Sequence, residues 1–595
     1  MAIARVTAHV AATVFLACRP AACTAGTIYV DAGLTTGADD GSSWVNAFRG
    51  PLGLRSALAA AQEGDEVWVA DGRYVPGLAG SPRTTAFTVP SGVAVYGGFA
   101  GGETSLDSRR PEVFTATLSG DMAGNGNSPP TDNALHVVVL ADCAQATVLD
   151  GFVVRDGVAN GSSASLGTRG GGMLITGGAP TVRSCVFDAS HASLFGGGIA
   201  VIGASPLVDR CVFRNNLAHS GVGIYHAEGS SATIRRCRFE GSPQVSGGTT
   251  GVGILSGGLL ANSLPSFVTI EDCFFSLTVP QFSCPSGVGV AVWEGEADIR
   301  RCEFVNLHTC GGGAGVAGDG TVRIDRCRFI GNEATADGGA AIHSFEGDYT
   351  VTNCLFIGND RQGFSTIQTG GRTRLINCTF FANGSASSLH AVFFPQSADF
   401  IVRNSIVWGN LSSMGESAAV ALPNRVHLPA FEDCIVQGWN GGLPGDRTFA
   451  AEPFFVDGAG LDGEPGTNDD DTHLAAGSPA IDRGRNSAFP ATIITDADGA
   501  PRRADVADTP DLGVGTRPII DLGAFEAPGD TCDSVDFNGD GLFPDNADLE
   551  DFLSVFSGGV CSTGTCGDID FNNDGLSPDN WDVEEFFGVF GGGSC

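Results

Sequence analysis

The sequence contains no lysine. All 32 basic residues are arginine, and 67 aspartate and glutamate residues give a formal net charge of −35. The absence of lysine excludes Schiff-base chemistry and lysine general bases. The acidic charge argues against binding to nucleic acid, whose phosphates would be repelled, and to anionic membrane surfaces. It is compatible with bound calcium, although solubility alone would also explain it.

Long apolar stretches are also scarce. After the first 25 residues, none reaches the roughly 20 apolar residues that a membrane helix requires. Residues 1–25 have the pattern of an export signal: Arg5 supplies the early charge, an apolar run ends at Ala17, and small residues follow. Cys18 could instead be a lipid-attachment cysteine. We therefore expect a secreted, extracellular or cell-surface-associated protein without a membrane span.

The sequence does contain a repeat: an apolar residue, two polar residues, then Cys-x-Phe. A repeat of about 26 residues with several short strands predicts a right-handed parallel β-helix, an all-β solenoid. A propeller blade needs about 40 residues, and a leucine-rich repeat needs leucine at fixed offsets. Ser405 and Cys434 continue the repeat with Val in place of Phe. The repeat cysteines are Cys185, Cys211, Cys237, Cys273, Cys302, Cys327, Cys354 and Cys378.

Equivalent residues in such a stack lie about 4.8 Å apart, so each repeated position forms a column. We predict that the Phe residues, Phe187 to Phe380, form a buried aromatic column. A glycine followed by an apolar residue recurs in register and is predicted to begin another strand of each rung. Three residues after the Phe position, stacked asparagine amides are expected to bond along the pile. They are Asn216, Asn332, Asn359, Asn383 and Asn410.

The repeat cysteines are expected to stay unpaired despite export. Stacked cysteines on in-register strands have parallel Cβ vectors, which is poor disulfide geometry, so we interpret them as small buried apolar residues. Cys284 and Cys310 lie outside this column and are candidates for a disulfide between adjacent rungs.

The repeats and the segments around them resemble a widespread group of bacterial surface proteins with right-handed β-helix repeats, related to the pectate-lyase-like superfamily. That superfamily includes lyases, hydrolases, epimerases and non-enzymes, so the resemblance implies a fold rather than an activity. The predicted organisation is an export signal (1–25), an N-terminal cap and first rungs (26–110), a β-helix (111–445), a closing region (446–528) and a duplicated module (529–595). We expect a capping helix near Ala57–Gln62.

The duplicated module is strongly acidic. Residues 532–561 and 566–595 align without a gap, and from Asp530 to Cys595 there are 15 acidic residues and no basic one. Oxygen-bearing side chains on alternate residues followed by Gly are typical of the start of a calcium loop. These side chains are Asp536, Asn538 and Asp540 before Gly541, and Asp570, Asn572 and Asp574 before Gly575. Apolar residues with helical spacing predict a helix after each loop.

The pair of loop-helix units resembles a dockerin, in particular the GC-type variant. The resemblance implies bound calcium, with further ligands from Leu542 and Leu576 at position seven, and attachment to a cohesin-like or other cell-surface anchoring protein. Position twelve, the usual place of the closing carboxylate, is Ala547 or Trp581 here. We therefore expect Asp548 and Asp582, one residue later, to close the loops. An acidic helical hairpin without metal is the alternative.

Four cysteines bound the two copies and allow three pairings. The equal spacing favours Cys532–Cys561 and Cys566–Cys595, although a clasp of the two ends is possible. In the closing region, Asp469 to Asp471 could bind calcium or form a plain acidic loop.

Catalysis would need convergent groups, such as paired carboxylates for glycoside hydrolysis, or calcium with a basic residue for uronide β-elimination. Glu228, Glu294 and Glu346 follow strand starts at equal spacing and are the candidate acids. Each precedes a glycine, so a turn residue is the simpler interpretation. Nearby aromatic residues could form a sugar-stacking strip or only cover the strand. They are Tyr225, Trp293, His343 and Phe345.

No Ser-His-Asp order, zinc-ligand spacing or phosphate loop accompanies these acids. Two hypotheses follow. One is a non-catalytic, adhesin-like binding scaffold attached through the calcium-dependent tail, which we favour. The other is a polysaccharide lyase or glycoside hydrolase delivered by that tail.

Overall fold

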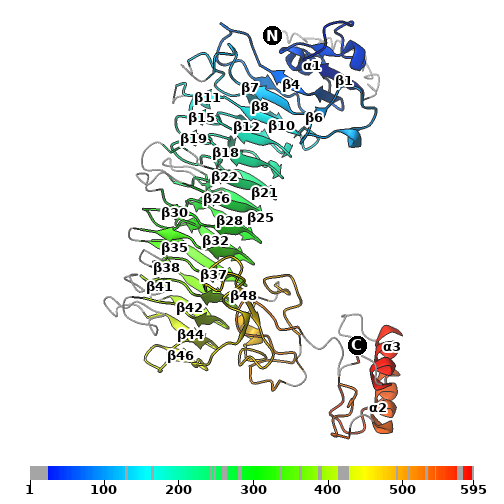
Figure 1. The fold of residues 1–595 in the computed structure, drawn as a ribbon, viewed down its shortest axis with the longest axis vertical. Coiled ribbons are helices and arrows are strands. Elements are labelled where there is room, and N and C mark those ends of the chain that lie inside the picture. Colours follow the sequence, from blue (N-terminus) through cyan, green and yellow to red (C-terminus); the bar gives the residue numbers. More distant parts are fainter. Residues whose placement is uncertain are drawn as a thin grey trace, which may run out of the picture.

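Successive turns of the chain stack into a parallel β-helix in the computed structural model (Figure 1). The structure describes residues 25–126, 131–162, 166–241, 244–245, 250–257, 264–278, 285–335, 338–360, 365–385, 392–397, 399–412, 428–490, 493–504, 506, 509–528, 534–542, 545–567, 569–571 and 580–591.

Three long parallel sheets form the walls of this solenoid. Sheet A contains, in spatial order, β2 (Phe48–Arg49), β1 (Thr27–Asp31), β3 (Glu66–Ala70), β6 (Ala94–Phe99), β9 (Val148–Asp150), β13 (Thr181–Arg183), β17 (Leu207–Asp209), β21 (Ser231–Arg235), β25 (Phe267–Glu271), β28 (Glu296–Arg300), β32 (Thr321–Asp325), β36 (Asp348–Thr352), β39 (Thr373–Ile376), β42 (Phe400–Arg403), β44 (Ala430–Glu432) and β46 (Gly445–Asp446). Sheet B contains β4 (Gly72–Tyr74), β7 (Ala116–Ser119), β10 (Phe152–Arg155), β14 (Val186–Asp188), β18 (Val212–Arg214), β22 (Arg238–Gly241), β26 (Phe274–Leu277), β29 (Glu303–Val305), β33 (Arg328–Ile330), β37 (Leu355–Ile357), β40 (Thr379–Phe381), β43 (Ile406–Trp408) and β45 (Ile435–Val436). Sheet C contains β5 (Phe87–Thr88), β8 (Val138–Cys143), β12 (Met173–Gly178), β16 (Ile199–Ile202), β20 (Ile224–Ala227), β24 (Ile254–Ser256), β27 (Val290–Val292), β31 (Val316–Ala317), β35 (Gly339–Ser344), β38 (Ser365–Thr369) and β41 (Phe393–Pro395).

Shorter elements complete the described structure. The short strands are β11 (Val158–Ala159), β15 (His191–Ala192), β19 (Leu217–Ala218) and β23 (Gln244–Val245) in one sheet, β30 (His308–Thr309) and β34 (Glu333–Ala334) in a second, and the antiparallel pair β47 (Phe455–Asp457) and β48 (Asp471–Leu474). The α-helices are α1 (Gly53–Ala60), α2 (Asn546–Phe556) and α3 (Asn580–Phe590). The 3₁₀ turns are η1 (Trp44–Asn46), η2 (Leu106–Ser108), η3 (Leu166–Thr168) and η4 (Asn486–Ala488). Among the described residues no helix is long and apolar enough to span a membrane.

The predicted aromatic column is confirmed. From Phe187 to Phe380, eight rings from sheet B stack almost parallel, with centroids of neighbouring rings 4.5–5.2 Å apart. The recurring glycine at the start of sheet C strands is explained by this column. A Cβ on Gly198 would lie 2.6 Å from the carbonyl oxygen of Gly223 and 3.0 Å from the ring of Phe213. A larger residue would push the strand off the aromatic core.

The asparagine ladder and the free cysteines are also confirmed. Asn359 donates from Nδ2 to Oδ1 of Asn383 at 2.9 Å and accepts from Nδ2 of Asn332 at 2.9 Å. All the repeat cysteines are buried and unpaired, as is Cys143 in sheet C. Burial raises the pKa of the Cys434 thiol to about 12, which suppresses the reactive thiolate.

The N-terminal cap contains the expected helix, shifted toward the N-terminus. Helix α1 begins at Gly53 rather than near Ala57, because the apolar spacing that faces the core starts at Leu54. Leu54, Ala57 and Leu58 join the same buried cluster as the strands of the first rungs. The chain becomes extended at Ala61, which ends the helix. The helix therefore covers apolar side chains of the first rungs.

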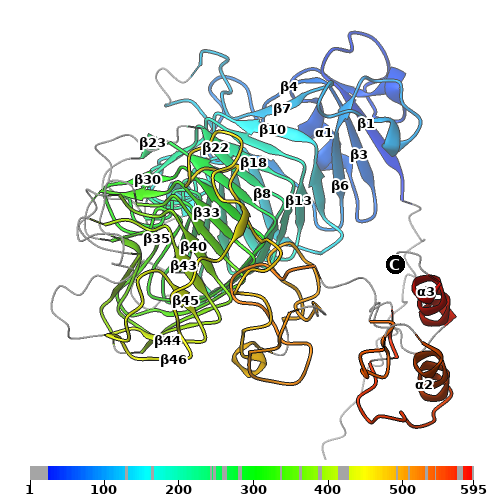
Figure 2. The same cartoon turned by 60° about the horizontal axis from the view of Figure 1, so that its bottom comes forward.

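The predicted closing region, residues 446–528, lies largely beside the β-helix (Figures 1 and 2). Its apolar residues Leu522 and Phe525 pack on the outer face of sheet B, against Ile406 and Leu355 respectively. Polar contacts attach it to the corner where sheet A turns into sheet B. Asn377 Nδ2 donates to the carbonyl of Asp521 at 2.8 Å, one of several such bonds.

The duplicated module folds as two helices around a small apolar core. The rings of Phe552 on α2 and Phe586 on α3 stack with centroids 3.9 Å apart, as the helical spacing predicts. Leu553 and Phe587 follow these rings with the same helical spacing, yet they are 43% and 45% exposed. A two-helix core is too small to bury every apolar position of both helices.

Candidate functional site

The outer face of sheet A carries a row of alternating charges, which we call the charge row. Its members end successive strands from β9 to β32: Asp150, Arg183, Asp209, Arg235, Glu271, Arg300 and Asp325. Because the strands are parallel and in register, each carboxylate lies one strand spacing from an arginine. Like charges at this spacing would repel, so the alternation removes that repulsion.

Ion pairs link neighbouring members of the charge row. Arg183 Nε lies 2.5 Å from the buried carboxylate of Asp150, and Arg235 Nε lies 3.3 Å from Asp209. Arg300 is 3.9 Å from Glu271. An exposed pair such as Arg300–Glu271 contributes about 0–1 kcal/mol to stability, whereas the buried carboxylates of Asp150 and Asp209 depend on their arginine partners.

The residue that follows each member of the charge row lies at the corner where sheet A turns into sheet B. These residues and their equivalents on later rungs form a second column, the corner column, and each of them has a left-handed backbone. Its residues are Ser184, Arg210, Arg236, Asp272, Arg301, Arg326, Asn353, Asn377, Asn404 and Asp433, all with φ between 48° and 54°. Asn353, Asn377 and Asn404 occupy the corner where the closing region docks. Their Nδ2 groups donate to the carbonyls of Thr495, Asp521 and Arg485.

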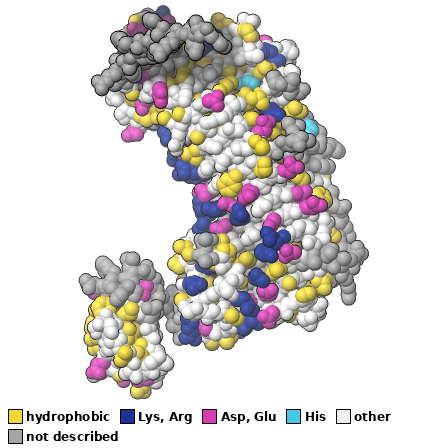
Figure 3. All heavy atoms as spheres, turned by 180° about the vertical axis from the view of Figure 1, so that it is seen from behind, with side chains coloured by type: hydrophobic (Ala, Val, Ile, Leu, Met, Phe, Trp, Pro, Cys, Tyr) yellow, Lys and Arg dark blue, Asp and Glu magenta, His cyan; other side chains and the backbone are white. Residues whose placement is uncertain are grey.

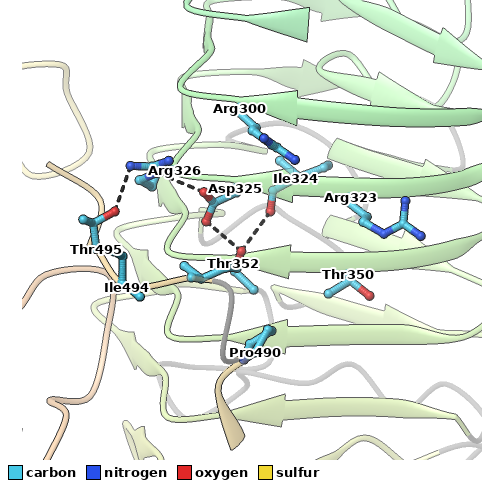
Figure 4. Close-up of a pocket in the computed structure, with 11 residues that line it drawn as sticks. Arg300, Arg323, Ile324, Asp325, Arg326, Thr350, Thr352, Pro490, Ile494 and Thr495 are labelled. Carbon is cyan, nitrogen blue, oxygen red and sulfur yellow. Dashed lines mark hydrogen bonds and ion pairs between the residues drawn. The ribbon is translucent and has the colours of Figure 1, made fainter. Parts of the chain in front are cut away.

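A cavity of about 680 Å³ lies between the outer face of sheet A and the closing region. Three arginines line it, Arg300, Arg323 and Arg326, together with one carboxylate, Asp325. Figure 4 shows Arg300, Asp325 and Thr352 on the strands and Ile494 and Thr495 on the facing segment. We call it the arginine cavity. Seen from behind, arginine side chains gather along one edge of the molecule (Figure 3).

Hydrogen bonds fix one side of the arginine cavity. Arg326 donates to Asp325 Oδ2 at 2.9 Å and to Thr495 Oγ1 at 2.8 Å, which joins the corner to the closing region. Thr352 Oγ1 donates to Asp325 Oδ1 at 2.8 Å. Arg323 is 56% exposed and lies 3.5–3.6 Å from Asp298 and Glu296. It is therefore the least constrained of the three guanidinium groups.

The three candidate acids lie in separate turns between sheets C and A. Glu228 and Glu294 adopt left-handed backbone, with φ of 60° and 51°. Glu228 is paired with Arg169 at 2.6 Å. Between the turns of Glu294 and Glu346 stands Asp319, whose Oδ1 accepts hydrogen bonds from the backbone of Phe345 and Glu346. Asp319 thus caps the next turn.

The structure does not place the candidate glutamates Glu294 and Glu346 on adjacent rungs. Pairing of β27 with β31, and of β31 with β35, places Glu346 two rungs from Glu294, roughly 10 Å at one strand spacing per rung. A retaining glycosidase needs carboxyl groups about 5–5.5 Å apart. The three glutamates are therefore turn residues.

The aromatic residues near these turns do not form one strip. Tyr225 is fully buried and stacks on Phe195, with ring centroids 4.5 Å apart. His343 packs edge-on against Phe345, which is 57% exposed. Trp293 packs beside the buried cluster that contains Tyr225.

The first loop of the duplicated module has the hydrogen bonds of a tight acidic turn. Oxygens of Asp536 accept from the backbone N–H groups of Asp540 and Gly541 at 3.1 and 3.0 Å. Asn538 Oδ1 also accepts from Asp540. Asp548, fully buried, accepts from Asn538 at 3.2 Å and from Asp545 at 3.0 Å. Asp548 and Asp545 also form the capping box of α2.

The predicted calcium ligands are brought together only in part. Asp548 folds back onto the loop that carries Asp536, Asn538 and Asp540, while Leu542 is 64% exposed. In the second copy Asp570 and the buried Asp582 are described, whereas Asn572, Asp574 and Leu576 lie outside the described residues. Among the described residues no group of three His, Cys, Asp or Glu side chains is arranged to hold a metal.

The chemistry of this donor set nevertheless fits a hard cation. Asp548 and Asp582 are buried in a module that contains no basic residue. Backbone hydrogen bonds from Asn538 and Asp545 offset part of the cost of burying Asp548, and a cation would offset more of it. Asp536, Asn538, Asp540 and Asp548 would hold a calcium ion, with oxygen donors of the kind that calcium prefers.

The favoured disulfide pairing is wrong. Cys561 and Cys566 are bonded to each other, because the linker between the two copies turns back on itself and brings them together. This bond excludes the pairs Cys532–Cys561 and Cys566–Cys595. It is the inner bond of the alternative pairing, in which the two ends of the module are clasped together. Cys532 and Cys595, which would form that clasp, lie outside the described residues. Cys310 is disulfide-bonded, and its proposed partner Cys284 also lies outside them.

The charge row and the arginine cavity were missed from the sequence. The signal was present in the two polar residues before each repeat cysteine. The first of them contributes to the charge row, and the second contributes to the corner column. The change of the corner from charged residues to Asn353, Asn377 and Asn404 marks where the closing region docks.

A comparison with protein families agrees with the β-helix. A family model described as "Right handed beta helix region" matches residues 266–422. Similar solved structures include pectate lyase Pel9A (15% identity, TM-score 0.33, covering 84% of this chain and 96% of that one), a rhamnogalacturonan lyase (14%, 0.29, 76% and 97%) and a polygalacturonase from Erwinia carotovora (10%, 0.27, 62% and 94%). No curated protein matches the chain. At these identities no activity is carried over.

Proposed function

We propose that this protein is an exported binding scaffold that holds an acidic polysaccharide against the outer face of sheet A. The observation that carries this proposal is the arginine cavity. In a chain with a net charge of −35, three arginines and one carboxylate line this cavity of about 680 Å³. A guanidinium group binds a carboxylate with two parallel hydrogen bonds, so uronate groups match this lining.

The rest of the lining suits a sugar chain. Thr350 and Thr352 offer hydroxyl groups on the strand side, and Pro490 and Ile494 offer apolar surface on the other. Ligand sites combine apolar walls with a few placed polar groups in this way.

The attachment of the scaffold forms the second part of the proposal. The duplicated module would bind calcium and dock to a cohesin-like or other anchoring protein on the cell surface. Its acidic loops and buried Asp548 and Asp582 support this part.

The binding proposal is tested with a glycan array and titration of acidic oligosaccharides into the full-length protein. The double variant R300Q/R323Q should lose at least about tenfold in affinity, because one lost charge-assisted contact is worth about 1.5 kcal/mol or more. The control is R214Q, on the outer face of sheet B, where a similarly exposed arginine faces Asp188. Equal binding by both variants and wild type would contradict the proposal.

A second candidate is a polysaccharide lyase or glycoside hydrolase. One observation favours it: the arginine cavity places Asp325 beside guanidinium groups, so an acidic and a basic side chain face the same space. The same polysaccharides are therefore incubated with the protein and calcium, and new reducing ends and unsaturated uronates are measured. Product formation that R300Q/R323Q abolishes would replace the scaffold with the enzyme.

A further inference from the structure

The closing region encloses a second cavity, of about 380 Å³, on the far side of the segment that walls the arginine cavity. Pro490, Ile493 and Ile494 line both cavities. The second one is otherwise walled by Phe489, Pro501 and Ile520. This volume lies within the range of about 300–1,000 Å³ typical of small-molecule sites, and apolar side chains form most of the wall.

Two consecutive arginines supply the polar part of this cavity. Arg502 is only 1% exposed, yet it lines the cavity and lies 5.7 Å over the ring of Phe489. Its Nη1 donates to Glu526 Oε2 at 3.3 Å, and its Nη2 donates to the carbonyl of Gly523. Its Nε has no hydrogen-bond partner within the described part of the chain. A buried donor without a partner is expensive, which points to a missing acceptor.

Arg502 has one carboxyl partner, Glu526, whose Oε2 lies 3.3 Å from Nη1 and is equally buried. Burial raises the pKa of Asp521 to about 6 and the pKa of Glu526 well above its usual range. The contact with Glu526 uses Nη1 and leaves Nε as the unpaired donor of Arg502 among the described residues.

Arg503 adds a second positive charge at the same cavity. It is exposed and lines the cavity, and its side chain makes no ion pair or hydrogen bond with any residue that the structure describes. The side chain of the remaining polar lining residue, Asn486, already forms hydrogen bonds within the closing region. Its amide donates to the carbonyls of Thr516 and Pro518 and accepts from Ile520. The free hydrogen-bonding capacity of this site thus consists of arginine donors only.

We propose that this cavity is a binding site for a small aromatic carboxylate. Its ring would lie among Phe489, Pro501 and Ile520, and its carboxylate would bind Arg503 and the unsatisfied donor of Arg502. An apolar body suits the walls, and a single negative charge suits Arg503, which has no ion pair with any described residue, beside the unpaired donor of Arg502. The site is separate from the arginine cavity and does not depend on the scaffold proposal.

The test uses 3-phenylpropanoate and its neutral amide with full-length protein, in saturation-transfer NMR and calorimetric titration. The acid should bind at least about tenfold more tightly than the amide, a difference of about 1.4 kcal/mol. The exposed variant R503Q should lose most of this preference, and F489A should weaken the acid and the amide alike.

R517Q provides the matched control, since Arg517 is 76% exposed in the same region and pairs with Asp511 instead. It should bind as wild type does. R300Q/R323Q, in the arginine cavity, should also leave phenylpropanoate binding unchanged, so failure here and failure of the polysaccharide proposal are distinguishable. Equal binding of acid and amide, unchanged binding by R503Q, or no binding at millimolar concentration would each overturn the proposal.

Discussion

At the scale of single residues, one aromatic ring per rung controls the packing of the interior. Phe329 is fully buried, with ring centroids 4.7 Å from Phe304 and 4.9 Å from Phe356. We expect Phe329→Ala to lower the free energy of unfolding by about 3–5 kcal/mol, through lost burial and the cavity that it leaves. Denaturant unfolding measures this. Phe345→Ala, at a ring that is 57% exposed, is the control and should change little.

The cysteines beside this column make a second prediction at this scale. Ten buried cysteines are free among the described residues, and desolvation raises the pKa of most of them. In the native protein they should resist alkylation, because all ten thiols are buried away from the reagent. In denaturant without reductant, thiol counting should recover about ten of them. Recovery of only one or two would mean that the column is oxidised.

At the scale of elements, the closing region depends on carboxyl groups buried beside the corner of the β-helix. The folded pKa of Asp521 is about 6 and that of Glu526 is also raised, whereas unfolded carboxyl groups titrate near 4. The folded state therefore binds more protons between these values. The stability that these groups contribute is present below about pH 4 and is lost as the pH rises through 6.

Glu526→Gln, which mimics the protonated acid, should remove part of this pH dependence. Hydrogen exchange of residues 480–527 should quicken between pH 5 and 7.5 in the wild type, after correction for intrinsic exchange, and less so in E526Q. Glu464→Gln, on an exposed loop of the same region, should behave as the wild type does. A steeper dependence in E526Q than in the wild type would contradict the assignment.

The elements also show where sequence reasoning succeeds. A column is specified one residue at a time by the repeat, so the Phe, Cys and Asn positions could be predicted from spacing alone. The predicted position of helix α1 was too far toward the C-terminus, because the packing of Leu54 against the core defines where the helix begins. The docking of the closing region could not be read from its own residues. It depends on apolar outer positions of sheet B, such as Leu355 and Ile406, which look like ordinary strand residues in the sequence.

At the scale of the whole molecule, the candidate sites combine segments far apart in the chain. The arginine cavity joins Arg300 to Thr495, and nothing local in either segment indicates the other. The candidate acids were, in contrast, chosen from a local pattern, and the structure separates them into turns. The duplicated module differs because each loop and the helix that follows it are adjacent in the sequence, so its ligand set could be proposed from the sequence.

The two folded parts should respond differently to calcium. The module has 15 acidic residues and no basic partner between Asp530 and Cys595, and its core is a few rings around Phe552 and Phe586. Mutual repulsion opposes its folding, and a small core offers little to offset this. Calcium would neutralise the loops and couple binding to folding. The β-helix, with its continuous buried column, has no such requirement.

Calorimetry of the full-length protein should therefore show two transitions, of which only the smaller moves with calcium. At a free calcium concentration one hundred times the Kd, that transition should gain about 2.7 kcal/mol for each site. The variant D536A/D570A should abolish the shift, whereas D469A, in the acidic loop of the closing region, should leave it intact. A shift that survives D536A/D570A and disappears in D469A would assign calcium to the closing region. A module equally stable in chelator would show that the buried Asp548 and Asp582 need no cation, and attachment through a calcium-dependent module would then be wrong.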